Sequence, residues 1–156
     1  MIQLHIPGRK SLKITHVILD YNGTIGKDGQ LIPGVAQAIE KFSDRLTFHV
    51  VTADTFGSVK KQLRDVNAAL TIISQENQDR KKLEYLKTLG AGQTLCVGNG
   101  HNDALMLEDA GLGIAVLGDE GLAFTCLSAS DLMVKNILDV FGLLEKPERL
   151  IATLRV

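Results

Sequence analysis

The sequence predicts a doubly wound α/β fold, in which helices cover both faces of a central parallel sheet. Short apolar runs of strand length recur along the 156 residues, at 17–19, 48–51, 70–73, 95–97, 112–116 and 132–134. Segments with apolar residues at helical spacing lie between most of these runs. Near-continuous apolar strands that alternate with helices are typical of a parallel sheet buried on both faces.

The first element is a predicted N-terminal β-hairpin beside the main sheet. Apolar and polar residues alternate over 2–6 and again over 12–14, and Pro7-Gly8-Arg9-Lys10 between them is typical of a turn. After the first strand of the main sheet, the segment 24–34 is rich in glycine and contains Pro33. We expect a loop or a small hairpin there.

Helices are expected wherever apolar residues recur every three or four positions. This spacing occurs over 35–42, 59–66, 83–89 and 136–144. Thr55 or Ser58 can cap the second of these helices, and Gly90 can end the third in a left-handed conformation. Pro147 follows shortly after the last predicted helix.

Composition indicates one globular domain over residues 1–156, with 45% hydrophobic and 22% charged residues. The net charge of −1 provides no field for nucleic acid or an anionic membrane, so neither is an expected partner. No apolar stretch is long enough to span a bilayer, and residues 1–10 lack a signal peptide, which predicts a cytoplasmic location. Cys96 and Cys126 lie in apolar segments and are predicted to be buried thiols.

The first segment that can carry chemistry is Asp20-Tyr21-Asn22-Gly23-Thr24, directly after the run 17–19. In doubly wound sheets, ligands bind beyond the carboxyl ends of the strands. Asp20 therefore faces the expected ligand crevice as a candidate nucleophile, and Gly23 permits a tight turn or a close backbone approach. The alternative is an ordinary turn built on Asn22 and Gly23.

Three further segments follow other strands. The run 48–51 ends in Thr52, whose hydroxyl can donate a hydrogen bond to a phosphoryl oxygen. Lys81 and Lys82 follow the run 70–73, and either ammonium group suits a phosphoryl dianion. The segment Gly98-Asn99-Gly100-His101-Asn102-Asp103 leads from a buried strand into a helix and carries oxygen ligands suited to Mg²⁺.

In this order, the four segments resemble the signatures of the haloacid-dehalogenase (HAD) superfamily, and within it the soluble P-type-ATPase-like proteins. The resemblance implies a Rossmann-like HAD fold without a cap domain, a Mg²⁺ cofactor and an aspartyl phosphate formed on Asp20. It implies catalytic roles for Asp20, Asn22, Thr52 and Lys82. Lys82 is preferred to Lys81 because its spacing to Leu86 and Leu89 resembles the family pattern better. It implies phosphate contacts from Gly23, Thr52, Ala53 and Lys82, and metal ligation by Asp20, the main chain of Asn22, and Asn99 or Asp103.

Two positions depart from the family pattern. Asn22 stands where most of these phosphatases have a second Asp that acts as general acid and base, and an amide cannot exchange a proton in that way. Asn99 stands where the family usually has a metal-binding Asp, so the site holds fewer negative ligands. We therefore expect slow turnover, and a non-catalytic module that binds phosphorylated ligands or regulates a partner is the alternative.

The expected substrate is a phosphorylated small molecule or a phosphoprotein, because an open site without a cap accommodates either. A homodimer or homo-oligomer is a further expectation, since a second subunit can cover such a site. A receiver-like signalling domain is disfavoured because the third main strand ends in Ser74-Gln75, without an Asp. His101 is expected to face solvent, and Asp54 either lines the cleft or caps a helix.

Overall fold

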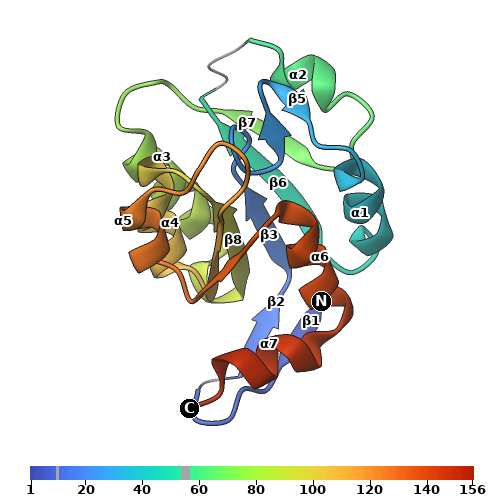
Figure 1. The fold of residues 1–156 in the computed structure, drawn as a ribbon, viewed down its shortest axis with the longest axis vertical. Coiled ribbons are helices and arrows are strands. Elements are labelled where there is room, and N and C mark those ends of the chain that lie inside the picture. The colour runs from blue at the N-terminus through green and yellow to red at the C-terminus, as the bar shows by residue number, and fades with distance from the viewer. Residues whose placement is uncertain (10, 54–56) are drawn as a thin grey trace.

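The computed structural model of the chain describes residues 1–9, 11–53 and 57–156. Its centre is a parallel sheet in the order β10-β9-β8-β3-β6-β7 (Figure 1). The strands are β3 (His16–Leu19), β6 (Thr47–Thr52), β7 (Ala69–Ile72), β8 (Thr94–Gly98), β9 (Leu112–Val116) and β10 (Leu132–Val134). This arrangement confirms the predicted fold class and all six predicted strands.

The sheet is buried on both faces because its apolar side chains alternate between two cores. On β3, Val17 and Leu19 belong to one core and Ile18 to the other. The first core includes residues of α1 (Val35–Phe42), α6 (Ile137–Glu145) and α7 (Pro147–Leu154). The second includes residues of α3 (Gln78–Leu89), α4 (Ala104–Asp109) and α5 (Phe124–Ser128), which lie on the opposite side of the sheet (Figure 1).

Two small hairpins accompany the sheet. The predicted N-terminal hairpin is present as β1 (Ile2–Leu4) and β2 (Leu12–Ile14), which form a separate antiparallel sheet. The glycine-rich segment forms the pair β4 (Gly26–Lys27) and β5 (Gln30–Leu31). In the described connection from β3 to α1, this pair is the only regular element, in agreement with a fold that has no cap.

Several helix predictions need correction. The helix expected over 59–66 is limited to α2 (Val59–Gln62). Ser58 occupies its N-cap position, but the Ser58 hydroxyl donates a hydrogen bond to the Gly29 carbonyl instead of capping the helix; Thr55 lies outside the described residues. The helix α7, which was not predicted, begins at Pro147. Proline suits the first turn of a helix, because the N–H groups there have no partner within the helix and proline has no N–H.

The order of the strands determines where a ligand can bind. The chain runs from β3 outward through β6 and β7, and then returns to the other side of β3 to build β8, β9 and β10. The reversal lies between β3 and β8, and in such sheets the crevice opens at the carboxyl ends of these strands. The two short 3₁₀ helices are η1 (Ala91–Gln93) and η2 (His101–Asp103), and η2 lies at this reversal, directly after β8.

Two further features are the state of the cysteines and the character of the helices. Cys96 and Cys126 are both free thiols and both buried, as predicted. No helix in the described parts of the chain has the length and apolar character needed to cross a membrane.

Candidate active site

Asp20 lies at the reversal of strand order. It follows β3 directly, and its backbone N–H donates a 3.0 Å hydrogen bond to the carbonyl of Val97 on β8. This bond continues the pairing of β3 with β8 by one residue. The residue is only 6% exposed, at the edge where parallel strands present their ends to a ligand.

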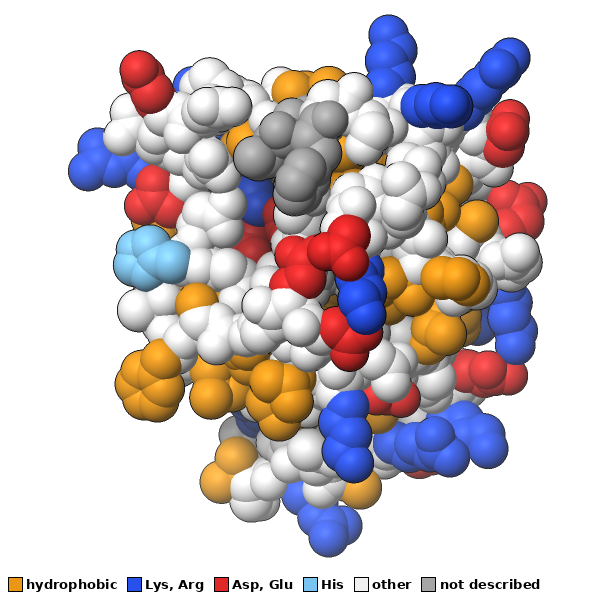
Figure 2. Space-filling view, turned by 45° about the horizontal axis from the view of Figure 1, so that its top comes forward, with side chains coloured by type: hydrophobic (Ala, Val, Ile, Leu, Met, Phe, Trp, Pro, Cys, Tyr) orange, Lys and Arg blue, Asp and Glu red, His pale blue; other side chains and the backbone are white. Residues whose placement is uncertain are grey.

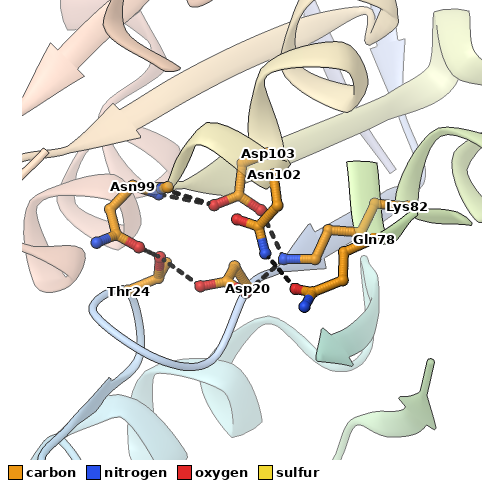
Figure 3. A network of polar contacts seen from close by, with 8 residues as sticks. Asp20, Thr24, Gln78, Lys82, Asn99, Asn102 and Asp103 are labelled. Carbon is orange, nitrogen blue, oxygen red and sulfur yellow. Dashed lines mark hydrogen bonds and ion pairs between the residues drawn. The ribbon is translucent and has the colours of Figure 1, made fainter. Parts of the chain in front are cut away.

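A buried lysine links the two carboxylates of the site. The ammonium of Lys82, on α3, lies 2.5 Å from Asp20 Oδ1 and 2.7 Å from Asp103 Oδ1 (Figure 3). Lys82 and Asp103 are completely buried. Such charges are retained in an interior only when they are paired, so the three groups act as one unit.

The electrostatics of this unit keep Lys82 charged and make the Asp20 carboxylate more basic than usual. Burial, followed by the nearby charge of Asp103, raises the pKa of Asp20 to about 6, and Lys82 only partly opposes this effect. Burial by itself lowers the pKa of Lys82, but Asp20 and Asp103 together outweigh it and raise the pKa above its usual value. Lys82 is therefore an ammonium ion at neutral pH.

Thr24 is a site residue to which sequence reasoning assigned no role. It is fully buried, and its hydroxyl lies 3.2 Å from both Asp20 Oδ2 and Asn99 Oδ1 (Figure 3). A hydroxyl has a single hydrogen, so it donates to one of these oxygens at a time. The only sign of this role in the sequence is that Thr24 ends the pentapeptide that begins at Asp20.

Asp103 organises the loop after β8. Its Oδ2 accepts hydrogen bonds from the backbone N–H groups of Asn99, at 3.0 Å, and Gly100, at 2.9 Å. Gly98 permits this approach, because a Cβ there would lie 2.4 Å from Asp103 Cγ. Since Oδ1 contacts Lys82, both carboxylate oxygens already have partners within the protein.

A small cavity of about 160 Å³ opens beside Asp20. Asn22 Oδ1 in this cavity is buried and has no hydrogen-bond partner, the only such side-chain atom among the described residues. Sequence reasoning named neither Gln78 nor the Asn102 side chain, and both line the cavity. The full lining comprises Asp20, Asn22, Thr52, Ala53, Gln78, Asn99, Gly100 and Asn102.

The structure brings together the residues predicted from the sequence in two groups. Asp20, Asn22, Thr52, Ala53 and Asn99 line the cavity. Lys82 and Asp103 do not line it, but both are in the same polar network, through Asp20 and through the loop that carries Asn99.

The remaining predicted positions lie beside this cavity or away from it. Gly23 has a φ of +80°, and a Cβ there would lie 2.3 Å from Asn99 Nδ2. Lys81 lies outside the site, where its ammonium donates to the Ser74 hydroxyl. His101 is exposed, with Nδ1 2.9 Å from Thr125 Oγ1, and Asp54 lies outside the described residues.

The donor set of the cavity fits a hard cation. Its candidate ligands are the oxygens of Asp20, Asn22 and Asn99, and oxygen ligands are those that Mg²⁺ prefers. The partnerless Asn22 Oδ1 marks a place where the fold leaves a polar atom for a ligand. No cluster of three or more His, Cys, Asp and Glu side chains suited to a metal occurs among the described residues, so amide, main-chain or water oxygens would complete the coordination.

Comparison with solved structures identifies the fold as that of the HAD superfamily. A 3-deoxy-D-manno-octulosonate 8-phosphate phosphatase of Moraxella catarrhalis, solved with magnesium, phosphate and the sugar acid, aligns over 91% of this chain and 94% of its own, with a TM-score of 0.65 and 19% identity. A protein of Legionella pneumophila assigned to subfamily IIIA of HAD hydrolases aligns over 90% and 87%, with a TM-score of 0.71 and 13% identity.

A third structure is much larger than this chain. It is a zinc-transporting PIB-type ATPase, with a TM-score of 0.63 and 21% identity over 79% of this chain. The match covers 20% of the ATPase. The fold is therefore shared with a part of that transporter as well as with small phosphatases.

Sequence comparison adds an archaeal relative. An uncharacterized protein of Methanocaldococcus jannaschii is 45% identical over 76 residues, which are 48% of this chain and 82% of the relative. The chain belongs to the same family as this archaeal protein. A search of described protein families finds no match.

Proposed function

We propose that this protein is a Mg²⁺-dependent phosphoryl-transfer enzyme that works through an aspartyl phosphate on Asp20. The observation that carries the proposal is the placement of the Asp20 carboxylate at the wall of a polar cavity, held by Lys82 on one oxygen and by Thr24 on the other. A carboxylate fixed in this way is oriented for attack. The solved phosphatase with bound magnesium and phosphate supports the assignment through the shared fold.

The reaction follows from the positions of the side chains. One oxygen of Asp20 attacks phosphorus, an O–P bond forms, and the bond to the leaving group breaks with its electron pair. Lys82 stabilises the charge that the carboxylate shares with the phosphoryl group, and Thr52, at the end of β6, donates a hydrogen bond to a phosphoryl oxygen. Ala53 lines the same wall and provides backbone beside the phosphate.

The metal would be held by Asp20, the main-chain carbonyl of Asn22, and Asn99. Asn99 is the better candidate of the two residues that the sequence left open, because Asn99 lines the cavity whereas Asp103 is fully buried and does not line it. When bound, Mg²⁺ supplies positive charge to the phosphoryl oxygens. Asp103 then acts as a positioning residue for Lys82 and for the loop that carries Asn99.

Slow hydrolysis is part of this proposal. Asn22 has no proton to give to a leaving group and cannot activate the water that cleaves an aspartyl phosphate. A persistent phosphoenzyme is the property that the resemblance to P-type ATPases implies, and the likeness to part of a PIB-type ATPase supports it. Reactive donors, such as acyl phosphates, should therefore phosphorylate Asp20 faster than water removes the group.

The proposed substrates are phosphorylated small molecules or phosphoproteins, which reach an open site directly. The described connection from β3 to α1 holds only the β4–β5 hairpin, which leaves the cavity mouth without a cap in that connection. We also propose that residues 1–156 form one domain without a cap.

Intact-mass analysis after incubation with Mg²⁺ and acetyl phosphate tests the proposal. We expect a mass increase of one phosphoryl group in the wild type and none in Asp20→Asn. Asp109→Asn makes the same change at an exposed position on α4 and should be phosphorylated like the wild type. Binding of phosphorylated ligands without any adduct would instead support the non-catalytic alternative.

A further inference from the structure

A second, larger depression adjoins the catalytic cavity. Its volume is about 540 Å³, and it shares Gln78 and Asn102 with the cavity that contains Asp20. We call it the amide shelf, because four of its side chains are carboxamides. It is lined by Gln75, Asn77, Gln78, Asp79, His101 and Asn102.

Two hydrogen bonds fix the border between the cavity and the amide shelf. Asn102 Nδ2 donates to Gln78 Oε1 at 2.7 Å, and Gln78 Nε2 donates to the Gln75 carbonyl at 3.1 Å. Figure 3 shows the pair Asn102 and Gln78 beside Lys82 and Asp20. A group attached to a phosphate in the cavity would therefore leave it across these two amides.

The outer part of the amide shelf presents polar groups to solvent. Asn77 is exposed and has the left-handed φ of +53°, and its side chain does not cap α3. The exposed His101 ring is held by Thr125 through Nδ1. Amide, carboxylate and imidazole groups are hydrogen-bond donors and acceptors that complement hydroxyl groups, which both donate and accept.

The charge of the amide shelf is negative. No Lys or Arg is among the described residues that line either the shelf or the catalytic cavity, and Asp79 adds a carboxylate. Lys82 is already paired with two carboxylates, and Lys81 donates to Ser74. In the space-filling view, most Lys and Arg side chains lie toward the outer edge of the face shown, and basic and acidic side chains lie together near its middle (Figure 2).

We propose that the amide shelf binds the leaving group of a sugar or polyol monophosphate that carries no second anionic group. This inference rests on the proposed phosphoryl-transfer function of Asp20. Hydroxyl groups match the amides, whereas a carboxylate or a further phosphate would meet Asp79 with no Lys or Arg in the described lining to compensate. This substrate class differs from the octulosonate phosphate of the Moraxella enzyme, since an octulosonate is a sugar acid.

A matched pair of esters tests the proposal in the Mg²⁺-loaded protein. Glucose 6-phosphate and 6-phosphogluconate have six carbons each, and 6-phosphogluconate carries an additional carboxylate. We expect kcat/KM to be roughly tenfold higher for glucose 6-phosphate, and Asp79→Asn to reduce this ratio by roughly threefold. Glu84→Gln removes a charge from an exposed position of the same helix and should leave the ratio unchanged.

Equal rates for the two esters, or faster reaction of 6-phosphogluconate, would overturn the inference. So would an equal response of the ratio to Asp79→Asn and Glu84→Gln. If neither ester reacts and acetyl phosphate leaves no adduct on Asp20, the proposed function fails separately. In that case calorimetry measures the binding of glucose 6-phosphate and of 6-phosphogluconate. Tighter binding of glucose 6-phosphate supports the inference, and absent or equal binding overturns it.

Discussion

Lys82 Nζ and Asp20 Oδ1 are 2.5 Å apart in the interior, although 62 residues separate them in the chain. The pair joins α3 to the end of β3, and Asp103 completes it from the loop after β8. Three elements of the sheet and its helices thus meet at one cluster of charges. The cluster that would orient Asp20 in the proposed reaction is therefore also a structural contact, and stability and the proposed chemistry depend on the same atoms.

Replacement of Lys82 tests this dual role. We expect Lys82→Met to lower the free energy of unfolding by about 3–5 kcal/mol, because two buried carboxylates lose their only cation among the described residues. Urea denaturation monitored by circular dichroism measures the change. Lys81→Met is the matched control, since Lys81 lies outside the site, and we expect a change within about 0.5 kcal/mol. Equal effects of the two substitutions would contradict the assignment of Lys82.

The raised pKa of Asp20 predicts a pH dependence of stability in the metal-free protein. Its pKa is about 6 in the folded state and near 3.8 in the unfolded chain. Between these values the folded state binds the extra proton, so this group makes stability fall as the pH rises from about 4 to about 6. The effect should be seen as a loss of wild-type stability relative to Asp20→Asn across this range, measured by urea denaturation in EDTA. A constant difference would contradict the burial of an ionisable Asp20.

The sequence predicted the sheet well because each strand is apolar over its buried length. The helix α5 escaped prediction because its five residues, Phe124–Ser128, are too few for a helical repeat to be visible. Pro147 was interpreted only as following the end of a helix, although proline is equally suited to the first turn of a new one.

In the site, the resemblance to the family pattern favoured Lys82 over Lys81, and in the structure Lys82 and Leu86 lie one turn apart on the same buried face of α3. The engagement of both Asp103 oxygens could not be predicted, since it depends on the backbone path through Gly98 and Gly100. The contact of Thr24 with Asn99 likewise joins residues 75 positions apart in the chain.

Asn22 is the position at which one substitution should increase activity. Asn22 lines the cavity, and its Oδ1 has no hydrogen-bond partner. Replacing Asn22 with Asp therefore breaks no hydrogen bond at that atom. We expect Asn22→Asp to accelerate hydrolysis of the phosphoenzyme by about 10²-fold or more, because general acid–base help is typically worth about 10² to 10⁴. Single-turnover decay of phosphorylated Asp20, followed by intact mass, measures this rate. An unchanged decay with Mg²⁺ bound would contradict the role given to this position.

Asn99 shows why an amide can be favoured at the proposed metal-binding position. Its Nδ2 donates a 2.9 Å hydrogen bond to the carbonyl of Gly121, and its carbonyl accepts from Ala123 N–H at 2.9 Å, so Asn99 ties the segment before α5 to the site. In Asn99→Asp, a carboxylate oxygen would face the Gly121 carbonyl. We expect the metal-free variant to lose about 1–3 kcal/mol of unfolding free energy, since an acceptor is left facing an acceptor.

The same variant should bind Mg²⁺ more tightly, by roughly tenfold, because the site gains a charged oxygen ligand. Saturating Mg²⁺ should then restore most of the lost stability, so that a thermal melt of Asn99→Asp shifts more with Mg²⁺ than a melt of the wild type. Asn67→Asp is a suitable control, because Asn67 bonds to Glu40 on the surface, away from the cavity. A Mg²⁺-dependent shift no larger than that of the wild type would place the cation elsewhere, and Asn99 would then serve only to hold the loop before α5.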